Sequence, residues 1–553
     1  MTALATAPAA PSAVRGPVFG STLAGTGSLL RFMLRRDRLR LLVWPLGVAL
    51  LYAGALGEYV ILGDDPEAMS VRATLMRTPA MISMAGPGYG VDDYTPGAAV
   101  ANELILWLVL TLAVMSILQV VRHTRAEEES SRSELVRAGA VGRHASSVAA
   151  LLQVVIANVL VAVVSGLVLV AFDFDAAESF TMTFSIALGA LVFGAVALVA
   201  AQAMEHGRGA TGISLAVLGG AYSLRAVGDI QEEHGSWLSW LSPIGWVQQT
   251  RVFVDLRWWP LGLCAAAIVL LIALAAVLGS RRDFGAGLVA VRAGRSDAAP
   301  ALTGPFALAW VQQRTALLWT SLGLGLMWFA SGGVVEAVPD LVESVADNPV
   351  YSAILGEGDD LIRAFLGVFG LYAGSGAAAF GVAMALRAKG EEESGRAGLV
   401  LTKPVSRARW LASGLVLALA GAAVVQVTGV LALWAGAASS GLDEPGFGAY
   451  LELALAYLPG LAVVVAFAAA LYAWVPKATG LAWVLFGYVF VVGMFADLFG
   501  LPDWARGISP FWWVGNPMVD GVDAAHLWGL CGVAALLFLL AFAGFRRRDL
   551  QNG

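Results

Sequence analysis

Two short stretches of this chain carry dense charges with the same spacing. The first has three glutamates at 127–129, then Ser130, Arg132 and Leu135-Val136, and the second repeats this pattern from Glu391 onward. Each stretch lies between two long apolar runs. Carboxylates and guanidinium groups at this density suit ion pairing with a protein partner. A solvated loop has no physical need for the same pattern twice, so we favour a binding role for both stretches.

Other residue types that could do chemistry point to no second site. The five histidines are scattered along the chain rather than paired at metal-ligand spacing, so the sequence predicts neither a metal site nor a catalytic centre. A P-loop needs a lysine that follows a glycine-rich turn. Lys389, Lys403 and Lys477, the lysines of this chain, all lack that context. We therefore expect that this chain is not an enzyme by itself and binds no cofactor.

The composition is that of a membrane protein. Of the 553 residues, 58% are hydrophobic and only 13% are charged, whereas a soluble protein carries roughly 25% charged residues. A deficit of this size along the whole chain places most of it in lipid. No basic region predicts a nucleic-acid partner, and the net charge of −6 says little about partners of any kind.

Apolar runs of about 20 residues, the length that spans a bilayer as a helix, recur along the chain. We predict an all-α polytopic membrane protein with twelve transmembrane helices. The predicted spans of the first half are 41–61, 99–121, 146–172, 180–204, 211–228 and 260–279. The predicted spans of the second half are 317–335, 361–386, 410–438, 450–475, 479–498 and 525–545.

The repeat extends beyond the charged stretches. Ala210-Thr211-Gly212 matches 478–480 before each fifth span, and Arg281-Arg282-Asp283 matches 547–549 after each sixth. Six spans per half return the chain to its starting side, so the two repeats are parallel. The predicted segments are a mobile cytoplasmic tail at 1–18, a first half at 19–283, a cytoplasmic linker at 284–305 and a second half at 306–553.

Basic residues set the orientation. An arginine cluster over 31–40 follows the tail, and residues 19–40 suit an amphipathic helix at the membrane surface. With both termini in the cytoplasm, most Lys and Arg lie inside, as the positive-inside rule requires. The basic residues left on the outer side are Arg72, Arg77, Arg225, Arg251, Arg257, Arg363 and Arg506. We expect a multi-pass protein of the cell membrane.

Together these motifs resemble a known family. E-E-E-S-x-R-x-x-L-V between the second and third spans, S-P-x-x-W-V before the sixth and a terminal R-R-D are similar to the membrane-spanning permease of an ABC-type exporter, in the actinobacterial drug or polyketide-antibiotic branch. The resemblance implies a type V exporter fold with an amphipathic elbow helix before each half. It also implies that the charged loops are coupling helices that dock on ATP-binding subunits.

Carried onto this chain, the coupling positions are Glu127, Glu128, Glu129, Arg132, Glu391, Glu392, Glu393 and Arg396. Because the chain contains both halves, one copy would work with two separate ATP-binding subunits, which would hold the ATP and Mg. The second and fifth spans of each half line the path in the resembled fold. The residues they would offer are Trp107, Leu110, Tyr222, Phe369, Tyr372, Phe486 and Phe490.

An apolar, aromatic path suits hydrophobic substrates such as drugs, antibiotics or lipids. The alternative for each aromatic residue is packing against a neighbouring helix or lipid. The predicted function is ATP-driven export by alternating access. A proton-coupled secondary transporter also fits parallel halves, but it tends to need a buried carboxylate, and the sequence offers none that stands out. A non-transporting membrane subunit is the third possibility.

Overall fold

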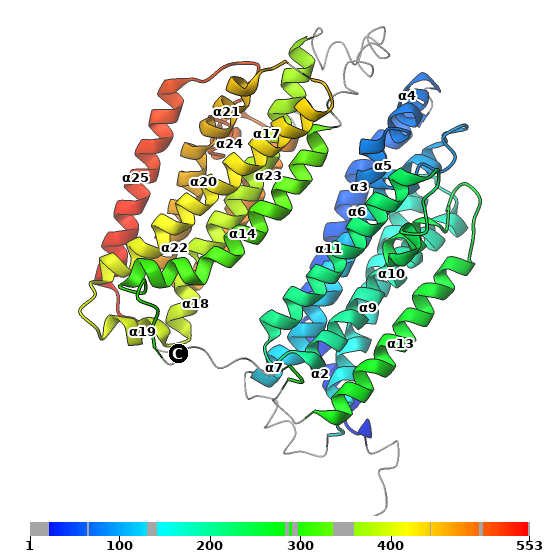
Figure 1. Ribbon diagram of the computed structural model, residues 1–553, viewed down its shortest axis with the longest axis horizontal. Coiled ribbons are helices and arrows are strands. Elements are labelled where there is room, and N and C mark those ends of the chain that lie inside the picture. The colour runs from blue at the N-terminus through cyan, green and yellow to red at the C-terminus, as the bar shows by residue number, and fades with distance from the viewer. Residues whose placement is uncertain are drawn as a thin grey trace, which may run out of the picture. The chain divides into compact units, whose positions relative to one another are not determined.

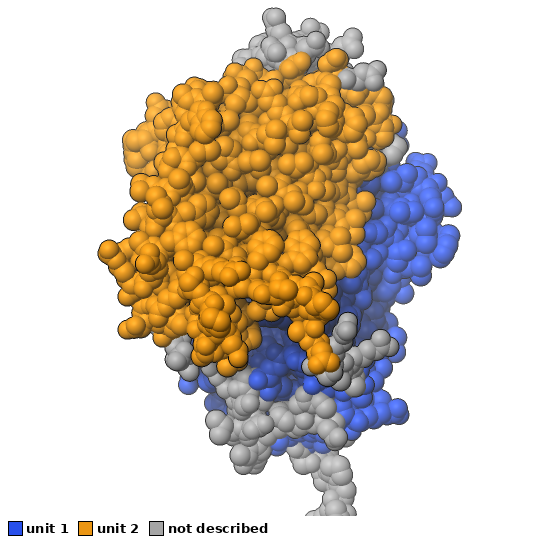
Figure 2. All heavy atoms as spheres, turned by 60° about the vertical axis from the view of Figure 1, so that its left-hand side comes forward, with its two compact units in different colours: residues 1–293 blue, residues 294–553 orange. Residues whose placement is uncertain are grey.

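The described part of the protein is helical throughout. In the computed structural model it comprises residues 22–63, 66–129, 141–282, 287–289, 297–333, 335, 359–442, 444–496 and 501–550. Within these ranges there is no β-strand, and the one isolated bridge joins Met204 to Val289. The chain divides into two compact units, residues 1–293 and 294–553, which have different colours in Figure 2. The predicted tail at 1–18 and Arg132 lie outside the described residues.

The first unit holds six long helices and several short ones (Figure 1). They are α2 (Thr26–Arg36), α3 (Arg38–Gly63), α4 (Pro66–Met76), α5 (Pro79–Ala85), α6 (Pro96–His123), α7 (Arg125–Glu129), α9 (Ala145–Ala171), α10 (Ala176–Ala203), α11 (Gly207–Gln231), η1 (Ser239–Leu241), α12 (Pro243–Gln248) and α13 (Trp259–Arg281).

The second unit contains a comparable set. Its helices are α14 (Pro305–Gly332), α17 (Asp359–Ala385), α18 (Arg387–Glu393), α19 (Arg396–Leu401), α20 (Arg407–Ser439), α21 (Phe447–Ala456), α22 (Leu458–Trp474), η3 (Pro476–Ala478), α23 (Leu481–Phe495), α24 (Asp503–Arg506) and α25 (Ala524–Arg547).

Eleven of the described helical segments are long and apolar enough to cross a membrane. They are α3, α6 with α7, α9, α10, α11, α13, α17 with α18, α20, α21 with α22, η3 with α23, and α25. The chain is thus a polytopic all-α membrane protein. The predicted span at 317–335 coincides with α14, which is not among the eleven. Polar residues Gln312, Gln313 and Arg314 dilute its first half, although Leu318 and Leu326 leave an exposed apolar face farther along. The count of twelve spans stays a prediction.

The expectation of an elbow helix in each half was correct for the first unit and wrong for the second. Amphipathic α2 ends at Arg36 and α3 begins at Arg38. Asp37 lies between the two helices, and its carboxylate contacts His123. In the second unit α14 runs unbroken from Pro305 to Gly332. No proline or ion-paired carboxylate interrupts α14, so nothing forces a break there.

Local capping explains where several helices begin. Thr95 precedes Pro96 at the start of α6, and its hydroxyl accepts a hydrogen bond from the Ala98 amide at 3.2 Å. Asp523 caps α25 in the same way, through the Ala525 amide at 2.8 Å. A side-chain acceptor at this position satisfies an amide that has no partner within the helix.

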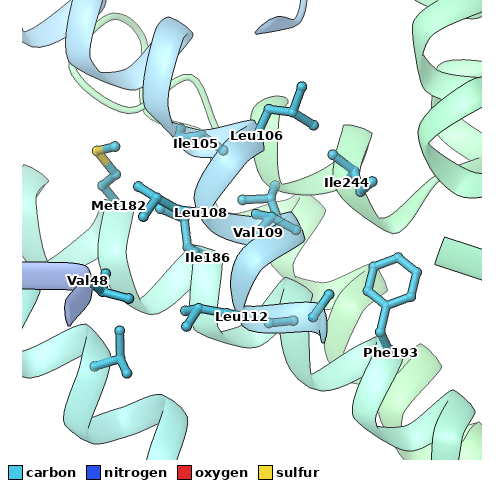
Figure 3. Packing of buried hydrophobic residues seen from close by; sticks show 14 of the residues in the cluster. Val48, Ile105, Leu106, Leu108, Val109, Leu112, Met182, Ile186, Phe193 and Ile244 are labelled. Atoms are coloured by element: carbon cyan, nitrogen blue, oxygen red, sulfur yellow. The ribbon is translucent and has the colours of Figure 1, made fainter. Parts of the chain in front are cut away.

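The core of the first unit is built around α6. Ile105, Val109 and Leu112 of α6 are buried and lie beside Ile186 and Phe193 of α10, as Figure 3 shows. Helices in lipid associate through close packing because lipid tails are as apolar as the side chains themselves. The second unit has its own separate core. There α14 and α20 approach each other closely where Gly332 and Gly436 lie, with no room for a larger side chain.

Candidate functional site

The middle glutamate of the first charged stretch is held by arginines and does not face solvent. Glu128 accepts two hydrogen bonds from Arg282, at 2.6 and 2.9 Å, and one from Arg125 at 2.5 Å. Arg282 directly follows α13, and its Nε donates to Gln202 near the end of α10 at 2.8 Å. The contacts tie the loop after α6 to the ends of α10 and α13. We call the Glu128–Arg282 pair the first glutamate clamp.

The second unit contains the same arrangement. Glu392 accepts hydrogen bonds from both terminal nitrogens of Arg548, at 2.7 and 2.6 Å, and another from the Tyr472 hydroxyl at 2.6 Å. Only 5% of the Glu392 side chain is exposed. Burial opposes the charge on Arg548, but its hydrogen bonds to Glu392 outweigh burial and raise the pKa of the guanidinium. We call this pair the second glutamate clamp.

A further arginine supports each clamp from the beginning of the next long helix, just before α9 or at the first residue of α20. Arg143 donates to the carbonyl of Arg282 at 2.9 Å, and Arg407 donates to the carbonyl of Arg548 at 2.6 Å. The repeated R-R-D motif thus has a structural meaning, because its second arginine closes the clamp in both units. The sequence showed the motif but not its partner.

The flanking glutamates differ between the two units. In the first, Glu127 pairs with Arg36 of the elbow helix α2, and Glu129 accepts a hydrogen bond from the Gly207 amide at the start of α11. A carboxylate at a helix N-terminus is favoured by the helix dipole. The first stretch is therefore bound to its own unit by all three glutamates.

In the second unit the flanking glutamates pair with residues of their own segment. Glu391 accepts two hydrogen bonds from Arg396, at 2.9 and 3.0 Å, within the same loop. These hydrogen bonds raise the pKa of Arg396. Glu393 has 65% of its side chain exposed, with Lys389 at 3.7 Å. On α19, the apolar side chain of Leu399 is 72% exposed.

A buried histidine contact that the sequence did not reveal fixes the elbow helix. His123 Nε2 lies 2.6 Å from Asp37 Oδ2, and both side chains are almost fully buried. His123 Nδ1 lies 2.9 Å from Arg36 Nη2. Arginine can only donate hydrogen bonds, so Nδ1 of His123 is the acceptor from Arg36. The other ring nitrogen, Nε2, then faces the Asp37 carboxylate. The signal available in the sequence was an aspartate among the arginines of the elbow.

The structure brings together three of the four substrate-path candidates in the second unit. Phe369 and Tyr372 of α17 lie 6.4 Å apart by ring centroid, and Tyr372 lies 6.2 Å from Phe490 of α23. Trp328 of α14 joins this aromatic cluster at 5.8 Å from Phe369. The fourth candidate, Phe486, contacts Trp483 of its own helix instead.

The candidates of the first unit form no such cluster. Trp107 is 43% exposed on α6, and Leu110 is partly buried against the core. The Tyr222 hydroxyl donates to the carbonyl of Ser83 at 3.3 Å. Whether these residues line a path stays a prediction.

One buried ion pair lies inside a candidate span. Arg225 and Asp229 of α11 are paired at 3.3 Å, and the Ser239 hydroxyl donates to Asp229 at 2.5 Å. Arg225 also donates to the carbonyls of Ile82 and Ser83, at 3.3 and 2.5 Å. Ionisable residues within spans are functional candidates by default. Here every charge has a partner, which also suits a structural role.

Two comparisons with known proteins agree with each other. A family model described as the C-terminal domain of the multidrug efflux system permease Rv1217c matches residues 302–546. The multidrug efflux system permease protein Rv1217c of Mycobacterium tuberculosis (strain ATCC 25618 / H37Rv) is 36% identical over 550 residues, covering 98% of each chain.

Proposed function

Because this chain belongs to the family of multidrug efflux system permeases that includes Rv1217c, we propose that it is the membrane subunit of an ATP-driven ABC exporter. That it is a drug-exporter permease follows from the family. The proposal adds the energy source, which is ATP hydrolysed by two copies of a separate subunit. It adds alternating access as the mechanism, with hydrophobic compounds as the substrates.

The glutamate clamps are the observation that carries this proposal. In each unit a largely buried carboxylate joins the segment after α6 or α17 to the end of α13 or α25. Gln202 of α10 and Tyr472 of α22 add a polar partner to each clamp. A bidentate pair between arginine and carboxylate is strong and geometrically specific. A push on either loop would therefore move several helices of that unit together, as alternating access requires.

A docking surface follows from what the clamps leave exposed. Glu393, Arg396 and Leu399 face outward in the second unit, whereas Glu392 is buried. We propose that the exposed groups contact the ATP-binding subunit and that Glu128 and Glu392 hold the loops in place. The termini would lie in the cytoplasm with both loops, as the distribution of basic residues favours.

The aromatic cluster of the second unit supports a hydrophobic substrate. Phe369, Tyr372, Phe490 and Trp328 offer ring faces and edges with no charged group among them. Aromatic rings bind apolar compounds through large contact areas without demanding hydrogen bonds. Compounds with few charges, such as lipid-soluble drugs, fit such a lining.

Purification of the solubilised chain from its native membrane tests the proposal. We expect an ATP-binding subunit to be recovered with it, and ATP rather than a proton gradient to drive efflux in reconstituted vesicles. Leu399→Asp is expected to reduce this recovery, whereas Val519→Asp, at an exposed apolar residue in the loop before α25, is the matched control. Recovery of the chain alone, with efflux driven by a proton gradient, would refute the proposal.

A proton-coupled transporter is the second candidate, and buried Asp229 is the observation that favours it. Such a carrier needs a carboxylate that binds and releases a proton within the membrane. Asp229 lies in a candidate span with 3% of its surface exposed. Its pairing with Arg225 weakens this candidate, since a neighbouring cation favours the ionised carboxylate. Gradient-driven efflux that Asp229→Asn abolishes would support it.

A further inference from the structure

A pocket of about 320 Å³ lies beside the first glutamate clamp. It is bounded by α9, α10 and α13 of the first unit (Figure 1). One end is polar, with Glu128, Arg143 and Arg282, and the opposite wall is apolar, with Leu151 and Ile272. Helices α9 and α13 each pack against α10 and hardly touch each other, which leaves the space between them.

The same position in the second unit is filled. Counted from the matching arginines, Ser146 corresponds to Trp410 and Gly279 to Phe545. The rings of Trp410 and Phe545 stack at 5.5 Å beneath the second clamp, and they bring α20 into contact with α25. The first unit has its pocket because small side chains, Ser146 and Gly279, stand where the second has aromatic rings.

The polar end of the pocket is cationic overall. Two guanidinium groups, from Arg143 and Arg282, line this end together with the single carboxylate of Glu128. Arg143 is exposed, and among the described residues its guanidinium donates a hydrogen bond only to the Arg282 carbonyl. Ser146 and Ser147 also line the pocket and can donate hydroxyl hydrogen bonds. An anionic group with several oxygen acceptors would match this set.

We propose that this pocket binds a membrane phospholipid with an anionic headgroup. The phosphate would lie against Arg143 and the two serines, with the start of an acyl chain along Leu151, Leu198 and Ile272. The neighbouring face of α13 is largely exposed and apolar, so a lipid can enter from the bilayer. This site would exist in the first unit alone, and the inference does not depend on the energy source of transport.

Titration of the purified chain with dioctanoyl phosphatidylglycerol, read by native mass spectrometry, tests the proposal. Ser146→Trp copies the residue of the second unit and should abolish saturable binding. Arg143→Ala should raise the dissociation constant about ten-fold, as expected when one charge-assisted hydrogen bond is lost. Arg407→Ala, the matching arginine of the second unit, is the control and should leave binding unchanged.

Two further probes separate the possible ligands, and melting temperatures show that each variant is folded. Dioctanoylglycerol, which lacks the phosphate, should bind at least ten-fold more weakly. Inorganic phosphate at millimolar concentration should not compete. Equal binding of dioctanoylglycerol, competition by free phosphate, or unchanged binding in both Ser146→Trp and Arg143→Ala would each overturn the proposal.

Discussion

Breaking the second glutamate clamp should destabilise the second unit strongly. Glu392→Gln keeps the size of the side chain but leaves the Arg548 guanidinium without a charged partner. Breaking a buried ion pair costs about 3–5 kcal/mol. Arg548 has 15% of its side chain exposed and can regain some water, so we expect a loss of about 2–4 kcal/mol.

Thermal unfolding followed by tryptophan fluorescence measures this loss. At roughly 2–4 °C per kcal/mol for a domain of this size, the melting temperature should fall by about 4–16 °C. Glu393→Gln is the matched control, because the neighbouring side chain is 65% exposed and its pair with Lys389 at 3.7 Å is a surface contact. Such pairs contribute about 0–1 kcal/mol.

A double-mutant cycle shows whether the effect comes from the pair. When Glu392→Gln is combined with Arg548→Gln, the total loss of stability should be smaller than the sum of the two single losses. The double variant has neither charge, whereas each single variant leaves one buried charge without its partner. Additive losses, or equal melting of Glu392→Gln and Glu393→Gln, would refute the clamp.

Three other outcomes follow from the same structure. Glu128→Gln should lower the melting temperature at least as much as Glu392→Gln does, because two largely buried guanidinium groups, those of Arg125 and Arg282, then lose this carboxylate; a paired comparison of melting curves checks this. Arg396→Gln should change stability by less than about 1 kcal/mol, because its side chain is 52% exposed; a larger fall in melting temperature would contradict this exposed position. Arg225→Gln should destabilise the first unit by about 3–5 kcal/mol because it leaves Asp229 buried without its cation, and the removal of both charges in Arg225→Gln with Asp229→Asn should recover part of that loss in the same assay.

Much of the fold was predictable because lipid leaves the chain few choices. A long apolar run must satisfy its own backbone hydrogen bonds in the bilayer, which a helix does within one segment. Most predicted spans therefore coincide with described helices to within a few residues, as at 146–172 and Ala145–Ala171. The predicted span at 450–475 is two helices that meet at Tyr457, just before Pro459, a residue that has no amide to donate.

The sequence identified the charged loops but not the role of each charge. Successive residues on a helix point about 100° apart, so one of three adjacent glutamates can face inward while its neighbours do not. Which one does so depends on where Arg282 and Arg548 arrive, and these lie more than 150 residues away along the chain. No local pattern contains that information.

The sequence by itself determined that this is a helical membrane protein with two charged stretches of the same residue pattern. Hydropathy and motif repetition are local properties of the chain and can be read from it directly. The tertiary structure alone decided that Glu128 and Glu392 are clamped, that His123 contacts Asp37, and that a pocket exists in one unit where Trp410 and Phe545 fill the other. Burial and side-chain contacts arise when distant helices pack together, so they follow from the arrangement of the helices and not from any one segment.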